Sequence, residues 1–170
     1  MSVHSMEMVT KHSVDRATDE AVRLWSFAST QYPIQDGVVI QEKLEYMVVE
    51  SASAFSFNAR RAMEVLPRDR EFRLCQPRYE WRPTVDGEVV GNLRDALNRI
   101  IHSGKMIVGF ERLPPESAVM PGGAYVIPYL RAETDRRKLS FIDTFALSHC
   151  FLYQVLPELH AKGAKADTVH

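Results

Sequence analysis

The sequence has little cysteine and no long apolar run, and both absences narrow the possible classes of protein. Its two cysteines, Cys75 and Cys150, lie far apart and form no C-x-x-C pair. A disulfide framework needs more cysteines, so we expect two free thiols, with Cys150 as a small core residue. No stretch approaches the roughly 20 apolar residues of a membrane span, and residues 1–12 lack the apolar region of a signal peptide. These features favour a cytoplasmic protein without a membrane partner.

An excess of charge of either sign is also missing. The net charge is −1, with 21 basic and 22 acidic residues, so no whole-molecule field attracts nucleic acid or anionic lipid. Any such binding would need a local patch. The one candidate is a segment with seven arginines against four acids, Arg60, Arg61, Arg68, Arg70, Arg73, Arg78 and Arg82. It is either a solvated surface with interspersed charges or a face that binds phosphate.

The short motifs of common cofactor and metal sites are absent as well. The sequence contains no G-x-x-x-x-G-K-[ST] loop, no G-x-G-x-x-G and no H-E-x-x-H, the signatures of phosphate, dinucleotide and zinc sites. His149 and His160 would lie about three helical turns apart, too far to share one metal ion. We therefore expect neither a cofactor nor a bound metal.

The composition is that of one globular domain. The chain has 170 residues, of which 45% are hydrophobic, and this is typical of a single domain with a core of its own. The polar, aperiodic ends predict a flexible N-terminus over residues 1–12 and a flexible tail over 161–170. The single domain then covers residues 13–160.

Two helices are predicted in the first half of the chain, over residues 15–31 and 36–66. Asp36 can cap the second, and Pro33 and Pro67 follow the two helices as breaks. The second helix has an apolar stripe with a period of 3.6 residues, and we expect it at the centre of the core. The stripe consists of Ile40, Leu44, Met47, Val48, Ser51, Phe55, Ala59, Ala62 and Leu66.

The second half predicts a long loop over 68–91, a short helix, three strands and a final helix. In the loop, Tyr79 and Trp81 either form a brief strand or anchor the segment to the core. Asn92 and Asp143 are suited to cap the two helices. The β-branched runs 106–110, 125–129 and 139–142 predict an antiparallel sheet, with Pro128 at an edge or a bulge. The predicted class is α+β, mainly α, with a helical bundle and a small antiparallel sheet inserted before the last helix.

The short helix carries the one polar constellation of interest. Its apolar side has Leu93, Ala96, Leu97 and Ile100, and the opposite side has Asp95, Asn98, Arg99 and His102. Histidine exchanges protons near neutral pH, and a guanidinium stabilises a phosphate in its transition state. This pairing suits metal-free cleavage of RNA. The alternative is an ordinary solvated surface, in which Asp95 and Arg99 form an i,i+4 ion pair.

The run Leu93-Arg-Asp-Ala-Leu-Asn-Arg-Ile-Ile-His102 resembles the motif helix of the HEPN superfamily of helical domains. There an arginine, often followed by a polar residue such as asparagine, precedes a histidine near the end of the helix. The order of elements over residues 36–160, with a hairpin after the histidine, is similar to that of bacterial and phage proteins of this type. The resemblance implies a HEPN-like helical bundle.

The resemblance also implies an RNA- or nucleotide-related role. Many members are metal-independent ribonucleases of defence or mobile-element systems, with a site built across a homodimer. Other members are non-catalytic and bind nucleotides or a protein partner, so a dimeric interaction module is the alternative function.

The motif places its arginine with four to six residues before the histidine, and this sequence has Leu97, Ala96 and Asp95 there. Asn98 and His102 match their positions. Arg99, or an arginine of the long helix, would have to replace the missing one. We therefore expect a catalytic set of His102, Arg99 and Asn98, with Arg94, Arg60 and Arg61 as substrate-binding residues.

Overall fold

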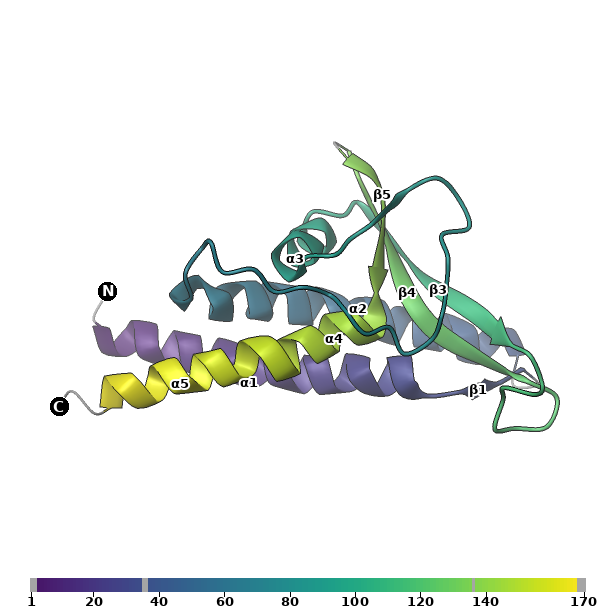
Figure 1. Cartoon of the computed structure of the whole chain (residues 1–170), viewed down its shortest axis with the longest axis horizontal. Helices are drawn as coiled ribbons and strands as arrows, with labels where there is room; N and C mark the ends of the chain where they lie inside the picture. The colour runs from purple at the N-terminus through teal and green to yellow at the C-terminus, as the bar shows by residue number, and fades with distance from the viewer. Residues whose placement is uncertain (1–2, 35–36, 136, 168–170) are drawn as a thin grey trace.

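The computed structural model describes residues 3–34, 37–135 and 137–167. Two long helices, α1 (Val3–Ser29) and α2 (Gly37–Ala62), run in opposite directions and pack along their length. A third rod consists of α4 (Thr144–Cys150), a π-helical stretch (Phe151–Val155) and α5 (Leu156–Asp167). The start of α1 and the end of α5 lie at the same end of the molecule (Figure 1).

Both terminal helices are longer than the sequence predicts. α1 begins at Val3 instead of Asp15, inside the segment expected to be flexible, and α5 continues to Asp167, beyond the expected end near Leu159. Extending an existing helix adds one hydrogen bond for each residue that is fixed, so polar, small residues can continue it without an apolar period. Residues 1–2 and 168–170 lie outside the described part of the chain.

Most of the predicted stripe on α2 forms the core. Eight residues of this helix are buried, Leu44, Val48, Ser51, Ala52, Phe55, Ser56, Ala59 and Ala62. Ile40 and Met47, which the stripe also includes, are 43% and 44% exposed. The apolar stripe is thus wider than the face that the neighbouring elements cover. The expected cap, Asp36, lies outside the described residues.

The sheet is mixed rather than purely antiparallel. Strands β3 (Lys105–Leu113), β4 (Ala124–Thr134) and β5 (Arg137–Asp143) pair in antiparallel order, as predicted. Two short strands that the sequence does not predict complete it. β1 (Tyr32–Pro33) pairs antiparallel with β4, and β2 (Glu88–Val89) pairs parallel with β5.

Pro128 lies in the middle of β4, where the pairing with β3 shifts register between Gly109 and Glu111. Of the two predicted positions for this proline, an edge or a bulge, the structure has the bulge. The reason is that proline has no N–H to give to the ladder, so it is tolerated where the regular pairing is interrupted.

The loop before α3 (Leu93–Ile101) is held against the sheet and the core. Phe72 is buried in the core, and the Trp81 ring packs on Tyr129 with 4.7 Å between ring centroids. The Trp81 indole donates a hydrogen bond to Asp143 Oδ2 at 2.6 Å, while Asp143 Oδ1 caps α4 by accepting from the Ala146 N–H at 2.7 Å. Trp81 thus anchors the loop, one of the two roles that the sequence left open.

Burial raises the pKa of the Asp143 carboxyl above its ordinary value of 3.8, and the hydrogen bonds from Ala146 and Trp81 oppose this rise. We expect a carbon-detected NMR titration to show the raised pKa, and Trp81→Phe to raise it further by removing one donor. The folded state then binds the proton more tightly than the unfolded chain. This carboxyl therefore contributes most stability below pH 3.8 and loses it as the pH rises through the raised pKa. A pKa at or below 3.8 would contradict the prediction.

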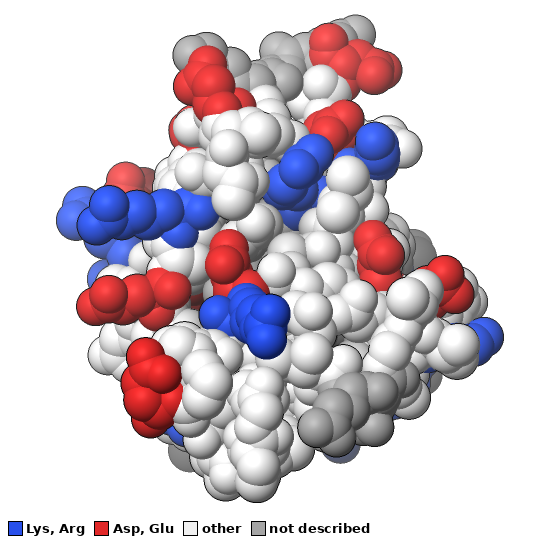
Figure 2. Space-filling view, turned by 90° about the vertical axis from the view of Figure 1, so that its right-hand side faces the viewer, with Lys and Arg blue, Asp and Glu red and all other residues white. Residues whose placement is uncertain are grey.

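Charges of both signs are mixed on the end of the molecule that lies opposite the termini. Figure 2 shows acidic and basic side chains interspersed there, with a broad uncharged area between them. This face therefore carries no patch of a single sign that would attract a polyanion.

Candidate functional site

Helix α3 begins and packs as the sequence predicts. The Asn92 side chain accepts a hydrogen bond from the Asp95 N–H at 3.2 Å and caps the helix. The apolar side is buried in the core and consists of Leu93, Ala96, Leu97 and Ile100. The polar side is divided between two environments, one closed by the sheet and the other facing α2.

Arg99 belongs to the closed side and is only 4% exposed. All three of its guanidinium nitrogens donate hydrogen bonds: Nε and Nη2 to Asp95 Oδ2 at 3.1 and 2.9 Å, Nη2 to Glu88 Oε2 at 2.9 Å, and Nη1 to Ser140 Oγ at 2.6 Å. Burial by itself lowers the pKa of Arg99, but the bonds to Asp95 and Glu88 outweigh it and raise that pKa. The guanidinium stays charged and ties α3 to β2 and β5.

The prediction that Arg99 acts on a substrate does not fit this position. Its donors are directed to side chains of the protein, because β2 and β5 cover this flank of α3. The expected ion pair with Asp95 is present, with 2.9 Å between Arg99 Nη2 and Asp95 Oδ2. Nothing in the sequence indicated that β2 and β5 would pack beside Arg99.

The other flank of α3 faces the C-terminal end of α2 and is rich in arginine. Arg60 Nη1 donates a hydrogen bond to Asn98 Oδ1. Arg94 Nη2 donates to the carbonyl oxygens of Met63 and Pro67, at 3.4 and 3.1 Å. Partial burial lowers the pKa of Arg94, and the nearby charges of Arg60 and Arg68 lower it further.

Three arginines therefore converge where α2 ends and α3 begins. The sequence identified two of them, Arg60 and Arg94, as substrate-binding candidates, and missed Arg68, whose only signal was its place in the arginine-rich segment. Arg61 is exposed in the last turn of α2 and makes no hydrogen bond or ion pair within the described chain. The positive charges of Arg60 and Arg68 lower the pKa of Arg94, and a bound anion would offset this repulsion.

His102 is exposed at the C-terminal end of α3. Its backbone N–H donates to Asn98 O at 3.0 Å, and its imidazole has no hydrogen-bond partner among the described residues. Arg94, Asn98 and His102 follow one another at four-residue intervals, so they lie along one flank of the helix. Arg60 reaches the middle of this row from α2. The structure thus brings these four residues together and directs Arg99 to the other flank.

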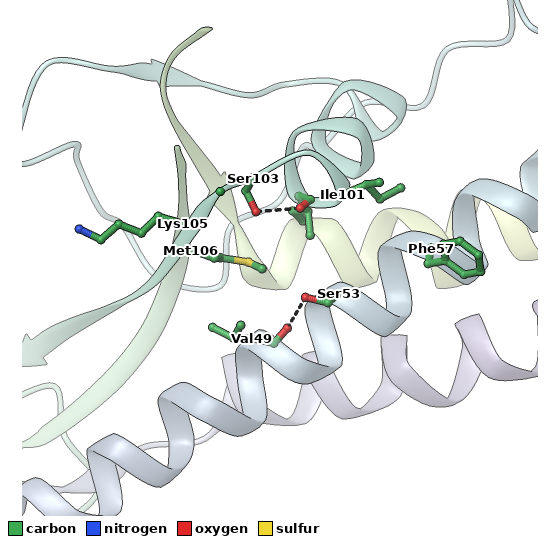
Figure 3. A pocket seen from close by; sticks show the side chains of 9 residues that line it. Val49, Ser53, Phe57, Ile101, Ser103, Lys105 and Met106 are labelled. Atoms are coloured by element: carbon green, nitrogen blue, oxygen red, sulfur yellow. Dashed lines mark hydrogen bonds between the residues drawn. The ribbon is translucent and has the colours of Figure 1, made fainter. Parts of the chain in front are cut away.

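A cavity of about 410 Å³ opens beside this row, between α2, the end of α3 and the start of β3 (Figure 3). Its apolar lining includes Phe57 of α2, Ile101 of α3 and Met106 of β3, and the hydroxyls of Ser53 and Ser103 also line it. His102 lies between two residues of the lining, Ile101 and Ser103. The cavity is therefore next to His102 in the chain, although His102 is not one of the residues described as lining it.

Comparisons of the chain with protein-family models, with curated proteins and with solved structures gave no significant match. Within the described ranges, no helix combines the length and the apolar composition that crossing a bilayer requires. No group of three or more histidine, cysteine, aspartate or glutamate side chains in the described part of the chain is arranged to hold a metal ion.

Proposed function

We propose that this protein acts on RNA as a cytoplasmic, HEPN-like ribonuclease of a defence or mobile-element system. The observation that supports this most is the hydrogen bond from Arg60 to Asn98. It brings a cation of α2 to the flank of α3 that carries His102, and so supplies the arginine for which the motif helix has no counterpart. Arg60 takes the role that the sequence first suggested for Arg99.

The chemistry follows from these groups. The His102 imidazole takes the proton of a ribose 2′-hydroxyl, whose oxygen then attacks the adjacent phosphorus. The bond from phosphorus to the 5′-oxygen breaks, and that oxygen takes a proton from a water molecule, while His102 returns its extra proton to the solvent. Arg60 and Arg94 offset the negative charge that builds up on the phosphate oxygens. The products are a 2′,3′-cyclic phosphate and a 5′-hydroxyl end.

We expect the purified protein to cut single-stranded RNA in EDTA and to leave 2′,3′-cyclic phosphate ends. His102→Ala should lower the rate by about 10²- to 10⁴-fold, the usual effect of losing a general acid or base. Arg60→Ala should lower it by about 10²-fold through the loss of charge stabilisation. Rates are measured with a labelled oligonucleotide, and the ends are identified by mass spectrometry.

The matched control for the histidine is His160→Ala, because His160 is an exposed histidine on α5. Its rate should equal that of the unaltered protein. Arg61→Ala tests whether the neighbouring arginine supplies the cation, and we expect less than a twofold change because Arg61 makes no hydrogen bond to Asn98. Cleavage that persists in His102→Ala, or that needs an added divalent metal, would contradict the mechanism.

The alternative function, a non-catalytic dimeric interaction module, is favoured by a different observation. The first half of α2 has several exposed apolar side chains: Val38 (68%), Val39 (67%), Ile40 (43%), Tyr46 (67%) and Met47 (44%). Exposed apolar surface of this kind is typical of a contact with another protein. We propose that it forms a homodimer interface, which both functions would use.

The oligomeric state can be measured directly. Sedimentation equilibrium at micromolar concentration should give about twice the chain mass of 19.4 kDa, and Val39→Glu should shift the protein towards the monomer because a charge would be buried in the contact. The control is Val119→Glu, since Val119 is 86% exposed on a loop. A monomer at every concentration would rule out the dimer, and with it a site shared between two chains.

A further inference from the structure

We propose that the cavity between α2, α3 and β3 binds a nucleotide base that carries an exocyclic amino group, with the phosphate of the same nucleotide on Arg60. The proposal rests on the proposed function, since it names the part of an RNA substrate that the site selects. Four properties of the cavity carry it: its size, its apolar walls, the direction of its hydroxyl groups and its charge.

The size and the walls suit a flat aromatic group. About 410 Å³ lies within the usual range of small-ligand sites. Phe57 is 58% exposed although it lines the cavity, so its ring is available for stacking. Base–aromatic stacking is a common source of affinity for single-stranded nucleic acid. The Met106 thioether and the Ile101 side chain line the same cavity (Figure 3).

The two hydroxyl groups limit which base edge fits. Ser53 Oγ donates its proton to Val49 O at 2.8 Å, and Ser103 Oγ donates to Ile100 O at 2.8 Å. A serine hydroxyl has one proton and two lone pairs, so each oxygen can only accept a further hydrogen bond. Figure 3 shows the two groups on α2 and on the turn between α3 and β3. Such oxygens favour a base edge with N–H donors, as in adenine or cytosine.

The charge around the cavity suits the phosphate. Phe57 precedes Arg60 by three residues and Ile101 follows Asn98 by three, so the Arg60–Asn98 hydrogen bond lies about one helical turn, or ~5 Å, beyond the cavity. A base stacked on Phe57 would thus lie close enough for its phosphate to reach Arg60. Lys105 lines the cavity at the end away from Phe57, with its ammonium group directed outward (Figure 3), and none of the residues described as lining the cavity is acidic.

The test compares adenosine 5′-monophosphate with purine riboside 5′-monophosphate, which lacks only the amino group. In amide NMR titrations of the full chain, both should shift the signals of Ser53, Phe57, Ser103 and Gly104. Adenosine monophosphate should bind about 3- to 10-fold more tightly, the usual effect of one hydrogen bond. Ribose 5-phosphate, which has no base, should bind more weakly than either.

The variants separate the parts of the site. Ser53→Ala and Ser103→Ala remove hydroxyl groups whose hydrogen bonds lie within their own helix or turn, so the fold should persist. The two nucleotides should then bind with nearly equal affinity. Arg60→Gln should weaken both nucleotides by the same factor. Equal binding of the two nucleotides, or shifts far from the cavity, would overturn the proposal. Concentration-dependent shifts at the cavity without ligand would assign it to a second copy and also overturn it.

A failure of the base pocket can be told apart from a failure of the proposed RNA cleavage. If RNA is cut but Phe57→Ala and the serine variants leave nucleotide binding and base preference unchanged, only the base pocket is refuted. If adenosine monophosphate binds as described but His102→Ala does not change the rate of RNA cleavage, only the proposed cleavage mechanism is refuted.

Discussion

Replacing Arg99 with alanine is expected to lower the free energy of unfolding by about 2–4 kcal/mol. Arg99 is 4% exposed and joins Asp95 of α3, Glu88 of β2 and Ser140 of β5. Its loss removes the hydrogen bonds from the guanidinium to all three partners and leaves an unfilled volume between α3 and the sheet. The cost stays below that of a fully buried ion pair because the side chains of Glu88 and Asp95 are 53% and 32% exposed and can be hydrated.

Urea unfolding followed by circular dichroism measures this change. Arg99→Lys should recover part of the loss, because an ammonium group cannot reach all three partners as the planar guanidinium does. Arg61→Ala, an exposed arginine without such contacts, should change stability by no more than about 0.5 kcal/mol. If Arg99→Ala were equally harmless, the role of Arg99 as a link between helix and sheet would be wrong. RNA cleavage in Arg99 variants must be compared at matched folded fractions.

The second large effect is expected at Phe55, in the middle of α2. Its side chain is fully buried and meets Phe151 edge to face, with 5.4 Å between ring centroids and an angle of 89° between the rings. Truncation to alanine leaves a cavity in a close-packed region, so Phe55→Ala should lower the free energy of unfolding by about 3–5 kcal/mol.

Phe57 provides the matched control, because it lies two residues further along the same helix and points about 200° away. It is 58% exposed, and Phe57→Ala should cost less than about 0.5 kcal/mol. The two variants are compared by thermal and urea unfolding under one set of conditions. Similar losses for both would mean that α2 presents a different face to the core. Phe57→Ala should instead weaken nucleotide binding.

Local patterns in the sequence predicted those structural features that depend on residues close together in the chain. Helical spacing identified the buried side of α3, and Asn92 and Asp143 were recognised as caps. Pro128 was expected at an edge or a bulge, and it lies at a bulge. Each of these follows from backbone geometry or from hydrogen bonds over three or four residues. The helix ends were less well predicted, because a helix can continue through polar residues once it has formed.

Contacts between distant segments were decided by the tertiary structure alone. Arg99 and Asn98 are adjacent on one polar face by helical spacing, yet the sheet encloses Arg99 while Asn98 binds Arg60, 38 residues away in sequence. The cavity likewise needs three elements, α2, α3 and β3, to meet. The sequence determined which residue types each helix flank carries. Which flank becomes a structural link and which remains open to a ligand depended on what packs against it, and periodicity contains no information on that.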